Sequence, residues 1–320
     1  MRVALQADQL VLHYLPIIEL STGEPRGVEA LVRWQPPHHP LVMPDDFLPA
    51  VAHTPVMHDI TRWVLNRGCR EMSRWPHWTL SVNVAAREVT DPRLVEWVSE
   101  TLARYGMQPR RLILELTEQA IVSDLEAATE VLGRLREIGV GLSLDDFGTG
   151  YSSLLYLRAL PLTELKIDRV FVRADSARPA DAAIVQSIVR LGRSVDLAVV
   201  AEGVETAATA SRLRAMGCRS AQGYLWGPPR AAPDVAADVG KAWRATSRTR
   251  RPPIGSRAQL SKHVAQRIQR LLDDGASMHT IAAALNREHL ETPHGTRWHA
   301  STVAQAVASL DAPEDAPHRP

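Results

Sequence analysis

Residues 112–145 read LILELTEQAIVSDLEAATEVLGRLREIGVGLSLD, and this stretch decides the fold class. Two short apolar runs, Leu112–Leu116 and Gly141–Asp145, flank an amphipathic segment, Leu125–Ile138. The apolar side chains of that segment recur at helical spacing and a glycine marks its end, at Val131, Leu132, Leu135, Ile138 and Gly139. A strand, a helix and a second strand in this order predict a βα unit that feeds a parallel sheet.

The same alternation extends from Val11 to Tyr224, with a further helix predicted at Ala182–Ser194. The predicted strands are Val11–Ile18, Val28–Arg33, Leu80–Val84, Leu112–Leu116, Gly141–Asp145, Glu164–Ile167, Ala198–Ala201 and Ala221–Leu225. Eight strands with intervening helices favour an α/β fold of the (β/α)₈ TIM type. A doubly wound open sheet is the alternative, because about 240 residues suit either architecture.

The composition is that of a folded globular protein. Of the 320 residues, 45% are hydrophobic and 23% are charged, which excludes disordered, collagen-like and disulfide-framework proteins. Cys69 and Cys218 lie on apolar segments and predict buried free thiols in a reducing compartment. No apolar run approaches the roughly 18 residues of a membrane span, and the N-terminus lacks a hydrophobic signal core. We therefore expect a cytoplasmic protein with no membrane partner.

The net charge of +1 hides an uneven distribution along the chain. Residues 1–240 carry 25 basic and 29 acidic side chains, a balance of −4, whereas residues 241–320 carry 12 and 7, a balance of +5. The sequence RTRRPP at Arg248–Pro253 interrupts the βα alternation. Four segments are predicted: a barrel over 1–243, a basic Pro/Arg linker over 244–258, a helix-turn-helix-like module over 259–311 and a disordered tail over 312–320.

The C-terminal module is predicted to be a small all-α unit of three helices. Gly275 ends the first helix, Ser277 is suited to cap the second, and the third follows Trp298. Each helix has an apolar face, formed in turn by Val264, Ile268, Leu271 and Leu272, by Ile281, Ala282 and Leu285, and by Val303, Val307 and Leu310.

Polar side chains recur where the predicted strands end. They are Asn83, Glu115, Asp145, Asp146, Lys166, Glu202 and Gln222, while Glu29 lies within the second strand. In a barrel these strand ends converge on one mouth, where catalytic groups lie. Carboxylate and amide oxygens suit Mg²⁺ or Mn²⁺ rather than zinc, and two such ions serve phosphoryl transfer. The pattern predicts phosphoester hydrolysis; the alternative for any single acid is a strand-end cap or a surface ion pair.

Seven motifs follow one another along the chain. They are VEALVRW (28–34), NVAAR (83–87), ELTE (115–118), DDFGTGYSS (145–153), LKID (165–168), AEGVET (201–206) and QGY (222–224). In this order they resemble the motifs of EAL-domain cyclic di-GMP phosphodiesterases, and the resemblance covers residues 1 to about 240. It implies a barrel whose first strand runs antiparallel to the others, two divalent cations, hydrolysis of cyclic di-GMP to linear pGpG, and a homodimer.

The resemblance also implies a set of metal ligands and a functional loop. The implied ligands are Glu29, Asn83, Glu115 and Asp145 for one ion, with Asp145 and Asp146 bridging to or holding the second. The glycine-rich loop 146–153 would couple substrate, metal and dimer contacts. Glu118 and Glu205 would support that loop.

Catalytic and substrate-binding roles follow from the same motifs. Lys166 and Glu202 would flank the attacking water, with Glu202 the better proton acceptor. Gln222 would position that water or the ligand shell. Val32 and Arg33 would contact substrate, since a guanidinium makes two parallel hydrogen bonds to phosphate oxygens.

Three residues depart from the family pattern. Leu15 replaces a usual Gln between Tyr14 and Pro16 and brings an apolar side chain to the expected substrate site, while Ala85 and Glu88 replace a usual Ser and Gln. Leu15 motivates an alternative hypothesis, in which a catalytically weak or inactive EAL domain senses cyclic di-GMP and acts as a DNA-binding transcription regulator. A third hypothesis, a scaffold barrel, gains no support from the retained Lys166 and Glu202.

The C-terminal segment, with IAAALN (281–286) and TPHGTRWHASTV (292–303), resembles the helix-turn-helix region of serine-recombinase C-terminal domains. That resemblance implies DNA as a partner. Ser301, Thr302 and Gln305 would begin a recognition helix. Phosphate contacts would come from basic side chains that include Arg250, Arg251, Arg257 and Lys262. The alternative is a solvated basic linker beside a bundle that binds protein or packs on the barrel.

Overall fold

The computed structural model describes residues 1–117, 124–148, 154–172, 179–235, 262–273 and 276–288, together with Leu290, Trp298, Val303, Ala306 and Val307. The chain divides into two compact units, Met1–Ser247 and Arg248–Pro320.

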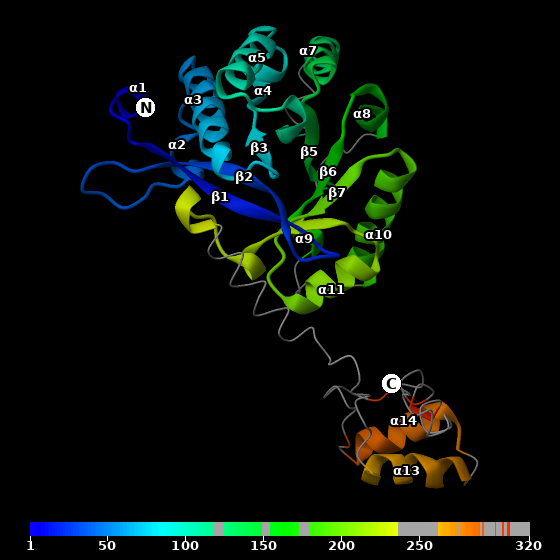
Figure 1. Ribbon diagram of the computed structural model, residues 1–320. Helices are drawn as coiled ribbons and strands as arrows, with labels where there is room; N and C mark the ends of the chain where they lie inside the picture. Colours follow the sequence, from blue (N-terminus) through cyan, green and yellow to red (C-terminus); the bar gives the residue numbers. More distant parts are fainter. Residues whose placement is uncertain are drawn as a thin grey trace, which may run out of the picture. The chain divides into compact units, whose positions relative to one another are not determined.

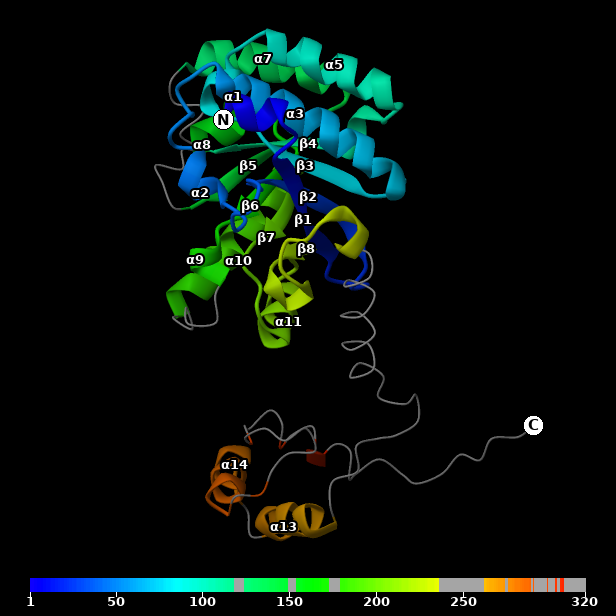
Figure 2. The ribbon, with the colours of Figure 1, turned by 90° about the vertical axis from the view of Figure 1, so that its left-hand side faces the viewer.

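Eight strands close into a barrel in sequence order (Figures 1 and 2). They are β1 (Leu10–Glu19), β2 (Pro25–Trp34), β3 (Thr79–Asn83), β4 (Leu112–Thr117), β5 (Gly141–Phe147), β6 (Glu164–Ile167), β7 (Ala198–Ala201) and β8 (Ser220–Gln222). Strand β1 runs antiparallel to both of its neighbours, β2 and β8, and every other neighbouring pair is parallel. The predicted TIM-type barrel with an antiparallel first strand is confirmed, and the open sheet is excluded.

The eighth strand is shorter than the sequence pattern predicts. It ends at Gln222, and residues Tyr224–Trp226 form the 3₁₀ helix η3 rather than continuing the strand. The chain turns at Gly223, where φ is +152° and an added Cβ would lie 2.2 Å from the backbone nitrogen of Val204. Only glycine fits this close approach, so the strand stops here although the following residues are apolar.

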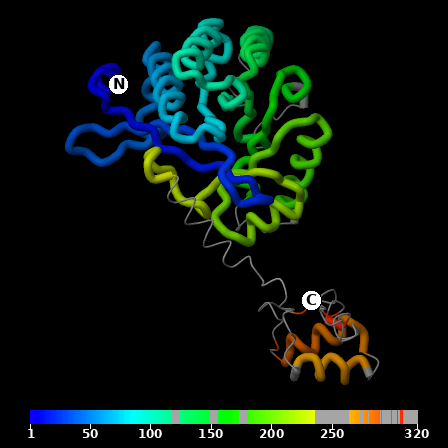
Figure 3. Tube along the Cα trace, viewed as in Figure 1, coloured from blue at the N-terminus to red at the C-terminus, as the bar shows by residue number. Residues whose placement is uncertain are grey.

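Helices lie outside the ring of strands, and the Cα trace in Figure 3 follows the alternation around the barrel. The α-helices are α1 (Arg2–Gln6), α2 (Pro44–Phe47), α3 (Val56–Glu71), α4 (Ala86–Val89), α5 (Arg93–Tyr105), α7 (Leu125–Ile138), α8 (Leu154–Ala159), α9 (Arg169–Val172), α10 (Pro179–Ser194) and α11 (Ala207–Ala215). Two further 3₁₀ turns are η1 (Met72–Arg74) and η2 (Pro109–Arg111).

Helix α7 has the predicted boundaries because both of its ends are capped. The Asp124 side chain accepts a hydrogen bond from the Ala127 backbone N–H, and Gly139 adopts the left-handed conformation at the C-terminus. Helix α10 begins at Pro179, three residues before the predicted start at Ala182. Proline is favourable at a helix start because the first N–H groups have no partner within the helix.

The hydrophobic core lies between the barrel and its helices. The outward faces of the strands pack against the inner faces of α3, α5, α7 and α10 in one continuous cluster. Cys69 and Cys218 belong to this cluster as free, buried thiols, as predicted. The strands also carry buried charged side chains outside this apolar cluster, among them Glu29, Glu115 and Lys166.

The second unit contains α13 (Lys262–Asp273) and α14 (Met278–Arg287) around a separate small core. The Ser277 hydroxyl caps α14 by accepting from the Thr280 N–H, as predicted. Asn286 fixes Trp298 through two hydrogen bonds, each of 2.8 Å, to the backbone N–H and C=O of Trp298. Of the predicted third helix, only Val303, Ala306 and Val307 lie among the described residues. Both Val303 and Ala306 are buried in this core.

Among the described residues, no helix combines the length and the apolar character needed to cross a membrane.

Candidate active site

The predicted polar residues meet at the mouth formed by the carboxyl ends of the parallel strands. Barrel register accounts for this, because Asn83 pairs with Glu115 across β3 and β4, and Asp145 pairs with Thr117 across β4 and β5. Glu202 follows directly after β7. The residues gathered here are Glu29, Asn83, Glu115, Asp145, Asp146, Lys166, Glu202 and Gln222.

Lys166 lies at the centre of this cluster, and its side chain is 1% exposed. Its Nζ lies 2.6 Å from Glu202 Oε1 and 2.8 Å from Glu115 Oε2. It also lies 3.3 Å from Glu29 Oε2 and 3.5 Å from Asp145 Oδ1. Burial alone would lower the pKa of Lys166, but these carboxylates, Glu115 and Glu202 foremost, hold it well above its ordinary value. Lys166 is therefore an ammonium group shared by four acids.

Two side-chain amides hold Glu29 in place. Asn83 Nδ2 donates to Glu29 Oε1 over 2.9 Å, and Gln222 Nε2 donates to Glu29 Oε2 over 2.7 Å. Burial opposes ionisation of Glu29, but Lys166 and the two amides outweigh it, so the pKa of Glu29 lies below its ordinary value. Gln222 also donates to Glu202 Oε1 over 2.9 Å and so links the two carboxylates.

The other acids of the mouth resist ionisation. Burial, followed by repulsion from Glu29, raises the pKa of Glu115 well above its ordinary value. Burial also raises the pKa of Asp145 and brings that of Glu202 to about 8. Burial and the neighbouring Asp145 raise the pKa of Asp146 to about 6. The mouth thus gathers five carboxyl groups, four of them in contact with the one ammonium group of Lys166, an imbalance that favours further positive charge there.

The donor set fits hard divalent cations. Ligand atoms of Asp145, Asp146 and Glu202 all lie within 4.8 Å of one another. Among the described residues, the buried oxygens Glu115 Oε1 and Gln222 Oε1 have no hydrogen-bond partner. Oxygen-only donors of this kind suit Mg²⁺ or Mn²⁺.

Two features of the mouth did not emerge from the sequence. Glu202, expected only as a proton acceptor, lies close enough to Asp145 and Asp146 to share a cation with them. Asp168 hydrogen-bonds with Asp146 and contributes to the raised pKa of Asp146. The LKID motif contains Asp168, so its place two residues after Lys166 was the available signal.

The implied substrate contacts also lie in the first hairpin. Leu15 pairs with Glu29 in the β1–β2 ladder, and both side chains are buried, so an apolar group sits beside the acidic cluster. Arg33 is 5% exposed, and its Nη1 donates to the Val32 carbonyl over 2.8 Å. Burial lowers the pKa of Arg33. Direct contact of Leu15, Val32 and Arg33 with substrate stays a prediction.

Several predicted functional residues lie outside the described residues. They are Glu118, the loop residues 149–153, and Arg250, Arg251, Arg257, Ser301, Thr302 and Gln305. The described part of the loop includes Gly148, where φ is +104°. Glu205 is exposed between β7 and α11, and Lys262 begins α13.

The chain was compared with known protein families and curated proteins. The family model described as "EAL domain" matches residues 1–229, and one described as "Recombinase" matches residues 260–309. MucR of Pseudomonas aeruginosa, named a bifunctional diguanylate cyclase/cyclic di-GMP phosphodiesterase, is 46% identical over 244 residues, 75% of this chain and 36% of MucR. NbdA of the same organism, a cyclic di-GMP phosphodiesterase, is 42% identical over 234 residues, 72% of this chain and 30% of NbdA. The chain spans about a third of the length of these curated relatives.

Solved structures agree with this family match. The PaMucR phosphodiesterase in complex with c-di-GMP has a TM-score of 0.69 and 46% identity, covering 73% of this chain and 97% of that chain. The EAL domain of Mycobacterium smegmatis DcpA has a TM-score of 0.62 and 35% identity, with 73% and 97% covered.

Proposed function

The chain belongs to the EAL domain family, and from this premise we propose that its barrel hydrolyses cyclic di-GMP to linear pGpG with two divalent cations, Mg²⁺ or Mn²⁺. The observation that carries the proposal is the buried Lys166 ammonium surrounded by four carboxylates at the barrel mouth. The 46% identity to a phosphodiesterase solved with c-di-GMP supports the choice of substrate.

The acidic residues of the mouth would hold the cations. Glu29, Asn83, Glu115 and Asp145 would bind one ion, and Asp145 with Asp146 the second. Bound divalent ions would neutralise these carboxylates and stabilise the negative charge that develops on the phosphodiester. Two buried oxygens without hydrogen-bond partners among the described residues, Glu115 Oε1 and Gln222 Oε1, are consistent with this role.

The side chains of the mouth would then act on water and phosphate. Hydrolysis forms one P–O bond from water and breaks one P–O bond of the cyclic diester. Glu202, which is held in place by Lys166 and by Gln222 Nε2, would accept the proton of the attacking water. Arg33 would bind a phosphate oxygen, because its contact with the Val32 carbonyl uses only Nη1.

A metal-dependent assay tests this function. The 320-residue chain is incubated with cyclic di-GMP and either Mg²⁺ or Mn²⁺, and the product is identified by chromatography. We expect pGpG to form, and Glu29→Ala to reduce the rate at least about 100-fold. Glu137→Ala, which changes an exposed acid on α7, is the matched control. Absence of turnover with both metals would refute the proposal.

For the C-terminal unit we propose DNA binding. The match of residues 260–309 to the recombinase family and the compact core around Trp298 support it. Lys262 with Arg250, Arg251 and Arg257 would contact phosphates, while Ser301, Thr302 and Gln305 would begin the recognition helix. We expect the full chain to bind duplex DNA with an affinity that falls as salt rises. Binding that is insensitive to Arg250→Ala combined with Arg251→Ala would contradict these assignments.

Leu15 beside Glu29 favours a second candidate function, a cyclic di-GMP sensor that regulates transcription with little turnover. Nucleotide-dependent DNA binding by a chain that does not hydrolyse cyclic di-GMP distinguishes this candidate from the first. Homodimerisation is part of either proposal. Light scattering of the purified chain, with and without cyclic di-GMP, measures it directly.

A further inference from the structure

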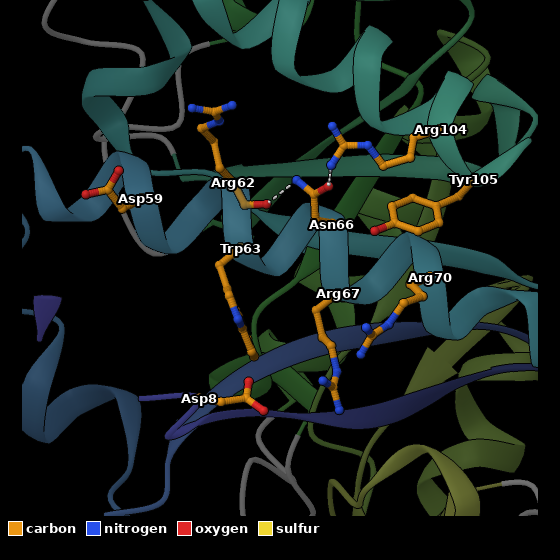
Figure 4. A pocket seen from close by; sticks show the side chains of 9 residues that line it. All are labelled: Asp8, Asp59, Arg62, Trp63, Asn66, Arg67, Arg70, Arg104 and Tyr105. Atoms are coloured by element: carbon orange, nitrogen blue, oxygen red, sulfur yellow. Dashed lines mark hydrogen bonds between the residues drawn. The ribbon is translucent and has the colours of Figure 1, made fainter. Parts of the chain in front are cut away.

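A second charged site lies on the outer surface of the barrel, between α3 and the C-terminal end of α5 (Figure 4). The cavity has a volume of about 440 Å³. Its lining includes Arg62, Arg67 and Arg70 from α3 and Arg104 from α5. We refer to this site as the α3–α5 pocket. None of its lining residues belongs to the mouth, so it is a separate feature of the fold.

Helical geometry brings the arginines together. Arg62, Asn66 and Arg70 are spaced four residues apart on α3 and therefore share one face of that helix. Helix α5 packs beside α3 and ends at Tyr105, which brings Arg104 into direct contact with Asn66. Three of the arginines lie on α3, and the packing of α5 against α3 adds Arg104 to them.

Several of these side chains are held in position before any ligand binds. Arg104 Nη1 donates to Asn66 Oδ1 over 3.0 Å, and Asn66 Nδ2 donates to the Arg62 carbonyl over 2.9 Å (dashed in Figure 4). The Arg62 guanidinium lies 5.4 Å from the ring centroid of Trp97. Groups fixed in this way lose less conformational entropy on binding.

The charge of the pocket is not balanced internally. The lining contains four guanidinium groups and two carboxylates, those of Asp8 and Asp59, a formal net charge of +2 that falls to +1 when the ion pair of Arg67 with Glu71 is counted. Arg67 is neutralised by Glu71, outside the lining. The exposed guanidinium of Arg70 has no hydrogen-bond or ion-pair partner within the part of the chain that the structure describes. The pocket therefore has an excess of positive charge that a bound anion would compensate.

From this arrangement we propose that the α3–α5 pocket binds a nucleotide through its phosphate groups. Guanidinium groups bind phosphate oxygens in pairs of parallel hydrogen bonds, and Arg70 and Arg104 supply the free donors. The volume of about 440 Å³ lies within the range of small-molecule sites and exceeds what one phosphate requires. Half-buried Trp63 and Tyr105 provide aromatic surface for a base, and the carboxylates of Asp8 and Asp59 accept hydrogen bonds from ribose hydroxyls or base N–H groups.

Calorimetric titration of the full chain with ADP and with inorganic pyrophosphate tests the proposal. Metal is removed beforehand with EDTA, so that phosphate groups are not drawn to cations at the mouth. We expect ADP to bind more tightly than pyrophosphate. Arg70→Ala and Arg104→Ala should each raise the Kd for ADP at least tenfold, while Glu29→Ala at the mouth leaves it unchanged. Arg134→Ala, an exposed arginine on α7, is the matched control and should bind like the unmodified chain.

Four results would overturn the proposal. They are absence of ADP binding at millimolar concentration, equal Kd values in Arg70→Ala and the unmodified chain, loss of binding in Glu29→Ala, and equal affinity for pyrophosphate and ADP. The last result would mean that the pocket recognises phosphate without a nucleoside. Arg70→Lys keeps the charge but not the planar pair of donors, and it should give an intermediate Kd. Thermal unfolding of each variant shows whether it is folded.

Discussion

Glu164 and Lys166 lie two residues apart on β6, both with buried side chains, yet their ionic environments differ. At the base of the barrel, Glu164 pairs with one partner, Arg26, so that charge is balanced. At the mouth, the one ammonium group of Lys166 contacts four carboxyl groups, those of Glu29, Glu115, Asp145 and Glu202. A balanced ion pair has a structural role only. An excess of buried carboxyl groups destabilises the folded protein unless a bound cation or substrate compensates their charge. The difference indicates which end of the strand is functional.

The strongest test of this comparison is Lys166→Met. Without the ammonium group, four buried carboxylates lose their shared partner, and we expect the free energy of unfolding to fall by about 3–5 kcal/mol in metal-free protein at pH 8. Hydrolysis of cyclic di-GMP should fall at least about 100-fold with metal present. Urea unfolding and the metal-dependent assay measure the two effects. Retained activity would show that the mouth does not depend on this charge.

The matched change at the base is Glu164→Gln. It leaves Arg26, which is 28% exposed, without its carboxylate. We expect the free energy of unfolding to fall by about 2 kcal/mol, less than for a fully buried pair because water reaches the arginine. The kcat should stay within about twofold of the unmodified chain. A large loss of kcat without loss of stability would abolish the distinction between the two ends of β6.

Glu88 provides a third ionic environment, a buried carboxyl group close to His58 and held by neutral donors. Thr61 Oγ1 and the Ala85 N–H donate to Glu88 Oε2, and His58 Nδ1 lies 3.3 Å from Glu88 Oε1. Burial raises the pKa of Glu88 to about 7 from an ordinary 4.5. Between these values the folded state binds more protons than the unfolded state, so stability from this group is present at low pH and is lost as the pH rises through 7.

Glu88→Gln should therefore stabilise the protein at pH 8 by about 1–3 kcal/mol, with the gain shrinking toward pH 5. Urea unfolding at the two pH values measures it, and activity at pH 8 serves as the control. A stability loss at pH 8 would mean that the ionised carboxylate is itself stabilising. Such a result would mean that the charge of Glu88 is compensated in the folded protein, as the charge of Glu164 is by Arg26.

The smallest expected effect concerns the apolar neighbour of the mouth. Leu15→Gln introduces an amide beside Glu29, where it can donate to the nucleotide or to the carboxylate. We expect the KM for cyclic di-GMP to fall about threefold to tenfold with kcat within about twofold, which corresponds to about 1 kcal/mol of binding. Leu15→Met is the control because it keeps an apolar side chain. Unchanged KM in Leu15→Gln would place Leu15 outside the substrate site.

Much of the fold was predictable because it is encoded locally. The alternation of apolar runs, the cap at Asp124 and the glycine at Gly139 gave the strand order and the limits of α7. The end of β8 was predicted wrongly because the close approach of Gly223 to Val204 depends on a distant strand. Local patterns contain no information about such contacts.

The sequence predicts which residues form the site but not which of their side chains contact one another. The motifs identified the acids of the mouth, yet the four contacts of Lys166 depend on strand register around a closed barrel. The pairing of Arg26 with Glu164, 138 residues apart, and the meeting of Arg104 with Asn66 have no signal in the sequence. These contacts come from tertiary packing between elements that are separate in the chain.

Strand β1 pairs with both β2 and β8, so that Ile17 lies beside Gln222. These residues are 205 positions apart, and because closing so long a loop is entropically costly we expect this contact to form late in folding. On the ribosome, the barrel cannot close until β8 has emerged. Gln222 also donates hydrogen bonds to Glu29 and Glu202, so the same event that closes the barrel completes the proposed active site. We therefore expect a nascent chain to lack the proposed activity until β8 has paired with β1.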